Sequence, residues 1–359
     1  MPDTTTLQLE ALDTLFFKDG KPFSLGEETW ADGIFPPPPS VVYGALRTAL
    51  MSGELGEQNL TDLIEQTENL QLAHFSVKLQ NGGQDEYYPI PLDVVEQKDK
   101  DYESGEYEVF PLEVKEVSTV SNSGHQVLPF YDADDDETVE PVAGGLISRS
   151  NLVRYLKGNT KPFKCRKWDN YKVPEPKIGI KRNRATLSTG DDGGELYRVG
   201  LQRTKGVQFQ LGFSLPVLSL QTQMIRLGAE GKVAKARQPD DPFDWNGPRN
   251  LTTRYLKVYL TTPGIFQNDG PELSKWGIKA ELKGMAVGKP FSLGGFDMNK
   301  GCPKPMLKVV PAGSVFYYEA PASVDLAQLQ GKAVADTING IDYAQQGFGI
   351  AYFGTWKKD

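Results

Sequence analysis

Residues 16–23 read FFKDGKPF and residues 35–47 read FPPPPSVVYGALR, and these two runs say most about the fold. Before them, Leu7–Phe17 is an apolar stretch typical of a β-strand, and the turn dipeptide Asp19-Gly20 ends it. Four consecutive prolines then predict a short polyproline segment outside any helix, because proline fixes φ and carries no amide hydrogen. The sequence therefore predicts a first strand followed by a rigid leader.

The leader is expected to deliver the N-terminus of a helix over Val41–Met51. Apolar residues recur there at helical spacing, and the hydroxyl of Ser40 is suited to cap the first turn. Gly44 costs such a helix about 1 kcal/mol relative to Ala unless close packing requires its missing side chain. Because a helix N-terminus attracts phosphate, Ser40 and the nearby amides are candidate ligands for a nucleic-acid backbone. A stiff turn and an ordinary core helix are the alternative, and the sequence leaves both open.

Six motifs in the same order carry a resemblance to a known family. The opening signature is followed by RNRATLSTGDDGGELY (182–197), RLGAEGKVA (226–234), YLTTPGIF (259–266), PAGSVFYYE (311–319) and GFGIAYFG (347–354). Together they resemble the RAMP-superfamily subunit of the type III-B (Cmr) CRISPR effector that binds the 5′ handle of the guide RNA. The resemblance spans nearly the whole chain, with a divergent middle from Asp93 to Leu146.

The resemblance implies an α+β fold of two ferredoxin-like (RRM-like) βαββαβ domains with long insertions, which agrees with the mixture of predicted strands and helices. We expect one domain over residues 1–200 and a second over 201–359. The hexapeptide KPFSLG occurs at 21–26 and again at 289–294, which is suggestive of a duplication.

The function that the resemblance implies is that of a non-catalytic scaffold. Such a subunit caps the 5′-handle end of the guide and links the large polymerase-like signalling subunit to the backbone RAMP subunits. An RNA-processing endoribonuclease of the wider RAMP superfamily is the alternative. It would need His74 or His125 near the scissile phosphate, since acid–base cleavage of RNA calls for such a group. His74 lies in an apolar strand, which is typical of a core histidine, and His125 lies in a loop beside an acidic run.

Charge is segregated along the chain. The net charge is −8, but residues 93–140 hold fifteen acidic and three basic residues, whereas residues 149–184 hold twelve basic and two acidic ones. Segregation, more than the total, decides where a polyanion can bind. Aromatic residues interleave with the basic ones, a combination suited to single-stranded RNA. The alternative is a solvated basic surface whose charge balances that of residues 93–140, the acidic insertion.

Three groups of residues are the candidate RNA contacts. The basic segment is expected to be extended, because prolines occur at 162, 174 and 176. The C-terminal glycine-rich loop before the last strand can form an anion nest or simply a tight turn. Arg47, two turns into the first helix, is either an RNA contact or part of a structural ion pair. The full set is Ser40, Arg47, Arg149, Arg154, Lys161, Lys164, Arg166, Lys167, Trp168, Lys181, Arg182, Arg184, Gly347, Phe348 and Gly349.

Other site chemistries find little support in the sequence. Cys165 and Cys302 are far apart, so neither a disulfide framework nor a thiolate metal site is expected, and a reducing cytoplasm fits. No cofactor is expected: the run GAEGK (228–232) lacks the spacing of a phosphate-binding P-loop. No secretory signal and no apolar run long enough to span a membrane is visible.

The remaining elements follow from periodicity. A short helix is expected over Asn59–Thr67, another over Ser148–Leu156, and a last one over Ala322–Leu329. A hairpin is expected around Pro311-Ala312-Gly313. The predicted strands are Gln71–Leu79, Tyr87–Leu92, Tyr107–Val117, Val207–Leu215, Tyr255–Thr261 and Ile350–Trp356.

Overall fold

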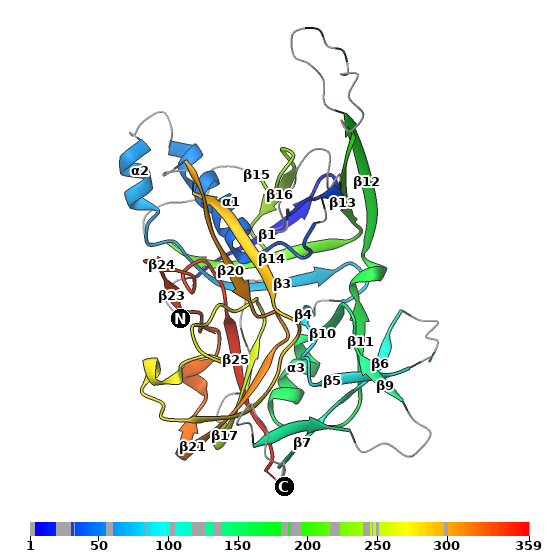
Figure 1. The fold of residues 1–359 in the computed structure, drawn as a ribbon, viewed down its shortest axis with the longest axis vertical. Helices are drawn as coiled ribbons and strands as arrows, with labels where there is room; N and C mark the ends of the chain where they lie inside the picture. The colour runs from blue at the N-terminus through cyan, green and yellow to red at the C-terminus, as the bar shows by residue number, and fades with distance from the viewer. Residues whose placement is uncertain are drawn as a thin grey trace.

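The structure is a computed structural model of the 359-residue chain. It describes residues 4–18, 30–31, 33–54, 60–83, 85–98, 100, 105–116, 126–131, 138–180, 186, 188, 196–215, 223–239, 245, 247–248, 251–297 and 301–358. Strands dominate and helices are few, which confirms a mixed α+β fold (Figure 1).

The larger sheet has eleven strands and forms the upper and right-hand part of Figure 1. Its central strands β1, β14 and β3 run antiparallel and bury apolar side chains. In spatial order the strands are β15 (Met224–Arg226), β16 (Val233–Arg237), β1 (Thr5–Ala11), β14 (Val207–Ser214), β3 (Gln71–Leu79), β4 (Glu86–Pro89), β10 (Gly145–Ser148), β11 (Phe163–Lys167), β6 (Tyr107–Pro111), β5 (Val94–Gln97) and β9 (Val139–Pro141).

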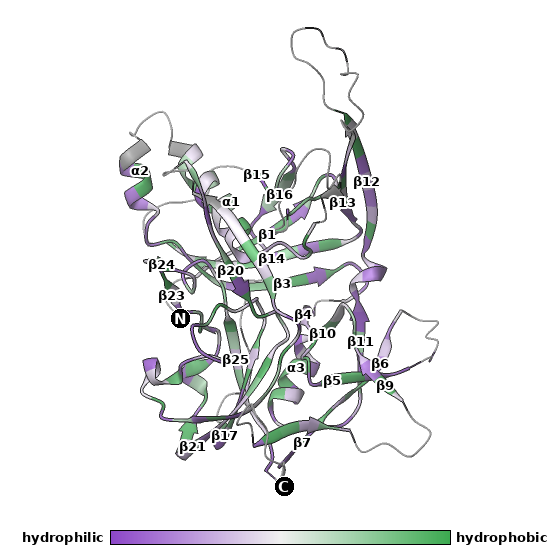
Figure 2. Ribbon diagram, in the orientation of Figure 1, coloured by the Kyte–Doolittle hydropathy of each residue, from purple (hydrophilic) through white to green (hydrophobic). Residues whose placement is uncertain are grey.

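A second sheet of five strands lies below the first in Figure 1. Its order is β18 (Glu281–Ala286), β21 (Val315–Asp325), β17 (Thr252–Leu260), β25 (Ile350–Thr355) and β22 (Lys332–Ala333). Figure 2 shows β25 as largely hydrophobic, and five of its six residues are buried. Gly354 lets β25 pass close to the helix α3 (Arg149–Leu156), because a Cβ there would lie 2.3 Å from the carbonyl oxygen of Leu156.

Smaller ribbons surround the two sheets. The longest is the arm at the top right of Figure 1, formed by β12 and β13. Their bounds are β12 (Lys172–Ile180), β13 (Leu196–Thr204) and β2 (Trp30–Ala31) in one sheet, and β19 (Phe291–Asp297) with β20 (Cys302–Val309), β23 (Thr337–Ile338) with β24 (Ile341–Asp342), and β7 (Glu113–Glu116) with β8 (Val127–Phe130) as pairs. The short helices are α2 (Leu60–Gln66) and the 3₁₀ turns at Trp168–Asn170, Leu273–Trp276 and Ala327–Leu329.

Helix α1 (Pro39–Glu54) packs on the larger sheet, with Val42, Leu46 and Leu50 in its core. The helix begins at Pro39, so the prediction that all four prolines lie outside it was wrong, and Ser40 lies in its first turn. Proline is tolerated there because a first-turn amide has no partner within the helix. The amides of Val41 and Val42 both donate to the carbonyl oxygen of Pro38, at 3.0 and 3.3 Å.

The two sheets share a core and a buried polar joint. Asp93, in the turn before β5, accepts hydrogen bonds from the hydroxyls of Tyr155 on α3 (2.6 and 2.7 Å) and Tyr317 on β21 (2.6 Å). Lys257 of β17 lies 3.4 Å from the same carboxylate, and both charged groups are buried. Burial lowers the pKa of Lys257, and the charge of Asp93 opposes that shift. Asp93 therefore ties the first half of the chain to the second sheet.

Most predicted elements are found, but two further predictions were wrong. The strand Gln71–Leu79 and the helices near 60–66 and 149–156 are present, and Ser148 caps α3 by accepting from the amide of Asn151. Residues 322–325 are strand instead of helix, because β21 stays paired to β17 up to Asp325. The expected hairpin around Pro311 is absent: β20 pairs with β19, and β21 pairs with β17 and β18.

The expected domain boundary at 200/201 falls inside β13. Strands β14, β15 and β16, which follow that boundary, lie in the larger sheet. The division into two ferredoxin-like domains at this point stays a prediction.

Candidate nucleic-acid interface

A cleft of about 750 Å³ opens beside the N-terminal half of α1. Helix α1 contributes Ser40, Gly44 and Thr48, which recur every four residues and therefore share one helix face. Gly44 leaves this wall open, because a Cβ there would meet no atom within 4 Å outside the helix backbone. The opposite walls come from the turn after β15, from the β19–β20 ribbon, and from the C-terminal glycine-rich loop. The fold thus brings the opening segment and the C-terminal loop to one site.

The cleft has a basic lining. Among the described residues that line it, the charged ones are Lys18, Arg226 and Lys304, and none is acidic. Arg226 is exposed and Lys304 half-buried, and neither has an ion-pair partner within the part of the chain that the structure describes. Cations without acidic partners in a concave wall concentrate the positive field where a polyanion would lie. The cleft is therefore electrostatically suited to a phosphate backbone.

The start of α1 offers fewer amides than the sequence predicts. Pro39 has no amide hydrogen, and the amides of Val41 and Val42 are already bonded to Pro38. Ser40 is what remains: its amide and hydroxyl find no partner among the described residues. Of the phosphate ligands that the sequence predicts at the start of α1, namely Ser40 and the nearby amides, only Ser40 is left, and it lines the cleft.

The glycine-rich loop is a packed turn and not an anion nest. The amides of Gly347, Phe348 and Gly349 donate to the carbonyl oxygens of Ala344 (3.0 Å), Tyr343 (3.1 Å) and Pro263 (2.8 Å). The side chain of Phe348 is fully buried, and it contributes to the cleft lining together with Gln346. The side chains of the loop therefore line the cleft, while its amides form the hydrogen bonds that stabilise the turn.

Replacing Gly349 with Ala is expected to destabilise the protein by about 2–4 kcal/mol. Gly349 has a φ of +66°, and a Cβ there would lie 2.8 Å from the backbone nitrogen of Ala335. Both the left-handed backbone and the clash disfavour any L side chain. Urea unfolding measures the effect. The matched control is Gly44→Ala, which meets open space in a helix and should stabilise by up to about 1 kcal/mol; equal stability of G349A and wild type would contradict this account.

Two residues of the basic segment are neutralised by the acidic insertion beside it. Strand β11 pairs with β6, which places the two oppositely charged segments in one sheet. Arg166 binds Glu106 at 3.0 Å, and Lys167 binds the buried carboxylate of Glu96 at 2.7 Å. For these two residues the structure supports the alternative of a balancing charged surface.

Three further candidates have structural contacts. Trp168 is buried, with its ring edge-on to Phe35 at 4.9 Å, so neither ring face is free to stack on a base. Arg47 donates to Thr67 Oγ1 (2.9 Å) and to the carbonyl oxygen of Ile64 (3.0 Å), which ties α1 to the end of α2. Arg149 lies 3.8 Å from Asp85.

Other members of the basic segment remain accessible. Arg154, Lys161 and Lys164 are exposed, and the Lys164 side chain is 71% exposed although it lies 3.6 Å from Glu106. None of the described residues 149–180 lines the cleft. The predicted contacts Lys181, Arg182 and Arg184 lie outside the described residues, as do His125 and the acidic run 132–137.

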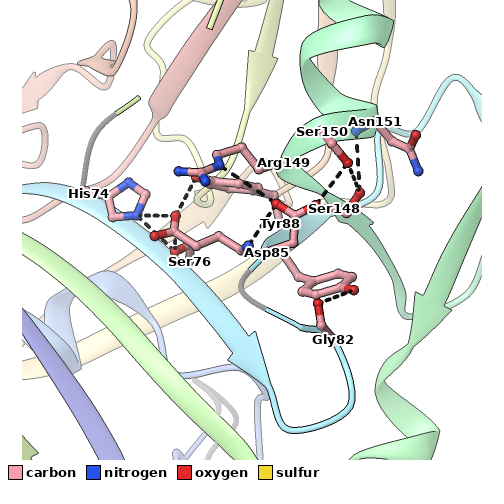
Figure 3. Close-up of polar contacts among 11 residues, drawn as sticks. His74, Ser76, Gly82, Asp85, Tyr88, Ser148, Arg149, Ser150 and Asn151 are labelled. Atoms are coloured by element: carbon pink, nitrogen blue, oxygen red, sulfur yellow. Dashed lines mark hydrogen bonds and ion pairs between the residues drawn. The ribbon is translucent and has the colours of Figure 1, made fainter. Parts of the chain in front are cut away.

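His74 is a core histidine, as expected from its strand. Its side chain is 2% exposed, and Nε2 contacts Ser76 Oγ at 2.9 Å (Figure 3). Nδ1 contacts the Tyr352 hydroxyl at 3.2 Å. Glu86 lies 3.4 Å from Nε2 and also accepts from Ser76 and Tyr88. This network joins β3 and β4 to β25, so His74 serves the contact between the sheets and does not face the cleft.

The Glu86 network predicts a loss of stability in acid. Burial raises the pKa of Glu86, but the hydrogen bonds and charge of His74 and the bond from Tyr88 outweigh it and lower this pKa from 4.5 to about 2. The stabilisation is therefore complete above pH 4.5 and is lost as pH falls through about 2. Glu86→Gln should cost roughly 3 kcal/mol at pH 6, with the gap to wild type closing toward pH 2. Thermal unfolding across this range measures it; a gap independent of pH, or a similar gap for the exposed control Glu108→Gln, would refute the assignment.

The described residues give no sign of metal or membrane chemistry. No three His, Cys, Asp or Glu side chains among them gather in a way that could hold a metal ion. Within the same residues, every helix is too short or too polar to cross a bilayer.

Sequence reasoning missed Arg226 and Lys304 as site residues. Arg226 begins the motif RLGAEGKVA, one of the segments that carry the family resemblance. Lys304 pairs across the β19–β20 ribbon with Gly295, directly after the second KPFSLG copy. The motif and the repeat were thus usable signals, but neither run is unusually basic, and only the fold brings them to α1.

Comparisons with known proteins give one family and several distant structural likenesses. The family described as CRISPR-associated protein (Cas_Cmr3) matches residues 7–356. No curated protein matches the sequence. The chain is similar to one chain in each of two cryo-EM structures of the type III-B Cmr-β complex bound to cognate target RNA, one of which also contains AMPPnP. In both cases the TM-score is 0.49 and the sequence identity 15%, and the similarity covers 87% of this chain and 86% of the matched chain. It is also similar to a chain of the Csm3–Csm4 subcomplex of the type III-A interference complex, at TM-score 0.38 and 13% identity, covering 89% and 98%.

Proposed function

Because the chain belongs to the CRISPR-associated protein (Cas_Cmr3) family, and is thereby a subunit of a type III-B CRISPR effector, we propose that it binds the 5′ handle of the guide RNA in the cleft beside α1. The observation that carries this proposal is the composition of the cleft. Ser40, Arg226 and Lys304 converge there, and within the described part of the chain they have no partner and no acidic residue lines the cleft beside them. The proline leader and the glycine-rich loop fix this arrangement.

In this arrangement a handle phosphate lies against Ser40, where the start of α1 adds its dipole to the two cations. Arg226 and Lys304 neutralise neighbouring phosphates from the two opposite walls. The aromatic residues of the described lining, Phe17, Tyr343 and Phe348, are buried, so the cleft favours contacts to the RNA backbone over contacts to bases. Such contacts give affinity and register more than sequence selectivity. The accessible Arg154, Lys161 and Lys164 are further proposed RNA contacts. Lys181, Arg182 and Arg184, which lie outside the described residues, stay proposed contacts on sequence grounds alone.

The proposed role is that of a non-catalytic scaffold that caps the handle end of the guide. It would contact the large polymerase-like subunit and the first backbone RAMP subunit, and it would consist of two ferredoxin-like domains. The burial of His74 between the sheets, with both ring nitrogens engaged, supports this role over the endoribonuclease alternative. That alternative predicts cleavage of precursor guide RNA by the purified protein, and loss of cleavage in H74A and H125A.

Competition binding tests the proposed function. Labelled guide RNA is bound to the full chain within its purified effector complex, and unlabelled RNAs that carry the natural 5′ handle or lack it compete for binding. We expect the natural handle to compete better and the affinity to fall steeply with salt. Equal competition by both RNAs, together with no dependence on salt, would remove the handle-binding assignment.

A further inference from the structure

One wall of the cleft beside α1 offers neutral hydrogen-bonding groups in place of cations. The described cations of the lining, Lys18, Arg226 and Lys304, all come from other segments of the chain. The segment at and just before the glycine-rich loop contributes Tyr343 and Gln346 instead. A phenol and a carboxamide do not neutralise a phosphate, so this wall is suited to a different part of a ligand.

Tyr343 is held by its ring and leaves its hydroxyl free. The residue is only 7% exposed, because its ring packs in an apolar cluster with Ile265 and Leu293 and lies edge-on to Phe348, with the ring centres 5.7 Å apart. Within the described part of the chain the hydroxyl has no hydrogen-bond partner, and it is not sealed from solvent as the unpartnered Nε2 of Gln210 is. Since Tyr343 lines the cleft, its hydroxyl is the polar end that it presents there.

This free hydroxyl is an exception among the buried tyrosines that the structure describes. Each of the others uses its hydroxyl in a hydrogen bond: Tyr87, Tyr88, Tyr155, Tyr171, Tyr259, Tyr317, Tyr318 and Tyr352. Buried polar groups are normally satisfied within the fold, and one that is left open at a cleft is available to a ligand.

The chemistry of the wall selects a ribose as that ligand. Burial raises the pKa of Tyr343, so the phenol stays protonated and can both donate and accept a hydrogen bond. Phosphate oxygens only accept, and they are drawn to the cations of the other walls. The described aromatic rings of the lining are buried and leave no face on which a base could stack. The ribose 2′-hydroxyl both donates and accepts, and it is the group that distinguishes RNA from DNA.

We propose that the hydroxyl of Tyr343 contacts a ribose 2′-hydroxyl in the cleft and thereby makes the site selective for RNA over DNA. The cations hold any polyanion, whereas this contact responds to the sugar alone. That the RNA is the 5′ handle of the guide rests on the proposed function.

The test uses Tyr343→Phe, which keeps the buried ring and removes only the hydroxyl. Three guide RNAs are titrated against the purified effector complex that contains the full chain: one with ribose, one with 2′-deoxyribose and one with 2′-fluororibose throughout the handle. The fluoro sugar keeps the ribose pucker but cannot donate. We expect wild type to bind the ribose handle roughly 3- to 10-fold more tightly than either substituted handle, which is the net effect of one hydrogen bond. Y343F should bind all three about equally, with an unchanged dependence on salt because no charge is lost.

The matched control is Tyr255→Phe. Tyr255 is half-buried against Trp356 and lies outside the cleft lining, so this variant should keep the wild-type preference for ribose. Urea unfolding of Y343F should match that of wild type, because the lost hydroxyl has no partner in the described fold. A Y343F complex that still prefers the ribose handle as wild type does would overturn the contact.

The outcomes separate this inference from the proposed function. If RNAs with and without the handle compete equally, the handle assignment fails. If the handle is preferred but wild type binds its ribose and 2′-deoxyribose forms equally, handle binding stands and the sugar contact is overturned.

Discussion

Replacing both Arg226 and Lys304 with Ala is expected to weaken guide RNA binding about 25-fold at 0.1 M salt. For single-stranded nucleic acid, each neutralised phosphate adds roughly 0.7 to the slope of log affinity against log salt. Two lost contacts therefore lower that slope by about 1.4, which amounts to about 25-fold over the decade between 0.1 and 1 M salt. These are the cleft cations that no acidic group in the described structure neutralises, so their full charge is available to the RNA.

Filter binding at several salt concentrations measures both quantities. The matched control is Lys279→Ala/Lys332→Ala, which removes the same charge from exposed positions outside the cleft lining. We expect the control to keep nearly the wild-type slope. If both double variants lose affinity equally, the RNA responds to net charge and not to the cleft. If Arg226 and Lys304 can be replaced with no change in slope, the cleft does not bind the backbone.

Replacing Asp93 with Asn is expected to reduce the free energy of unfolding by about 3–5 kcal/mol. The change leaves the buried ammonium of Lys257 without its counter-charge, and removing one partner of a buried ion pair is far more costly than removing both. The hydroxyls of Tyr155 and Tyr317 also lose a charged acceptor. Because these groups come from α3, β17 and β21, the loss falls on the contact between the sheets.

The double variant Asp93→Asn/Lys257→Met is the informative comparison. Methionine fills the space of the lysine stem without a charge, so the second change should restore most of the stability that the first removes. Urea unfolding of the wild type, both single variants and the double variant gives the coupling energy directly. Additive losses would show that Asp93 and Lys257 act independently. Full stability of D93N would mean that the tyrosine and lysine contacts contribute nothing.

The local sequence pattern predicted most of the helices and strands but not which strands pair with each other. The apolar alternation of residues 71–79 and the helical spacing of residues 41–51 each predict the correct element. They do so because the residues on the buried face of a strand or helix recur at a short, fixed spacing in the sequence. The hairpin expected around Pro311 failed because strands separated by a turn need not pair. β20 pairs with the preceding strand β19, and β21 with β17 and β18.

The basic segment shows the limit of charge counting. Twelve basic residues between 149 and 184 predict an RNA surface, yet Arg166 and Lys167 are paired with Glu106 and Glu96 of the acidic insertion. The sequence records both charges but not their distance, which the pairing of β11 with β6 sets. Conversely, the sequence around Arg226 or Lys304 is not unusually basic. The two residues become site candidates only because both line the same cleft.

Residues 16–47 and the five later motifs, taken as sequence, were sufficient to identify the family, since a family signature is a matter of residue type and order. They also predict the rigid leader and the helix behind it, because proline and helical periodicity act within a few residues. Tertiary structure alone decided where the cleft beside α1 forms and which cations line it. In the folded chain Pro39 is part of the helix, the amides of the glycine-rich loop are hydrogen-bonded within the fold, and Arg166 and Lys167 are paired with acidic residues. The field at a site depends on distances between charges, and only the folded chain sets those distances.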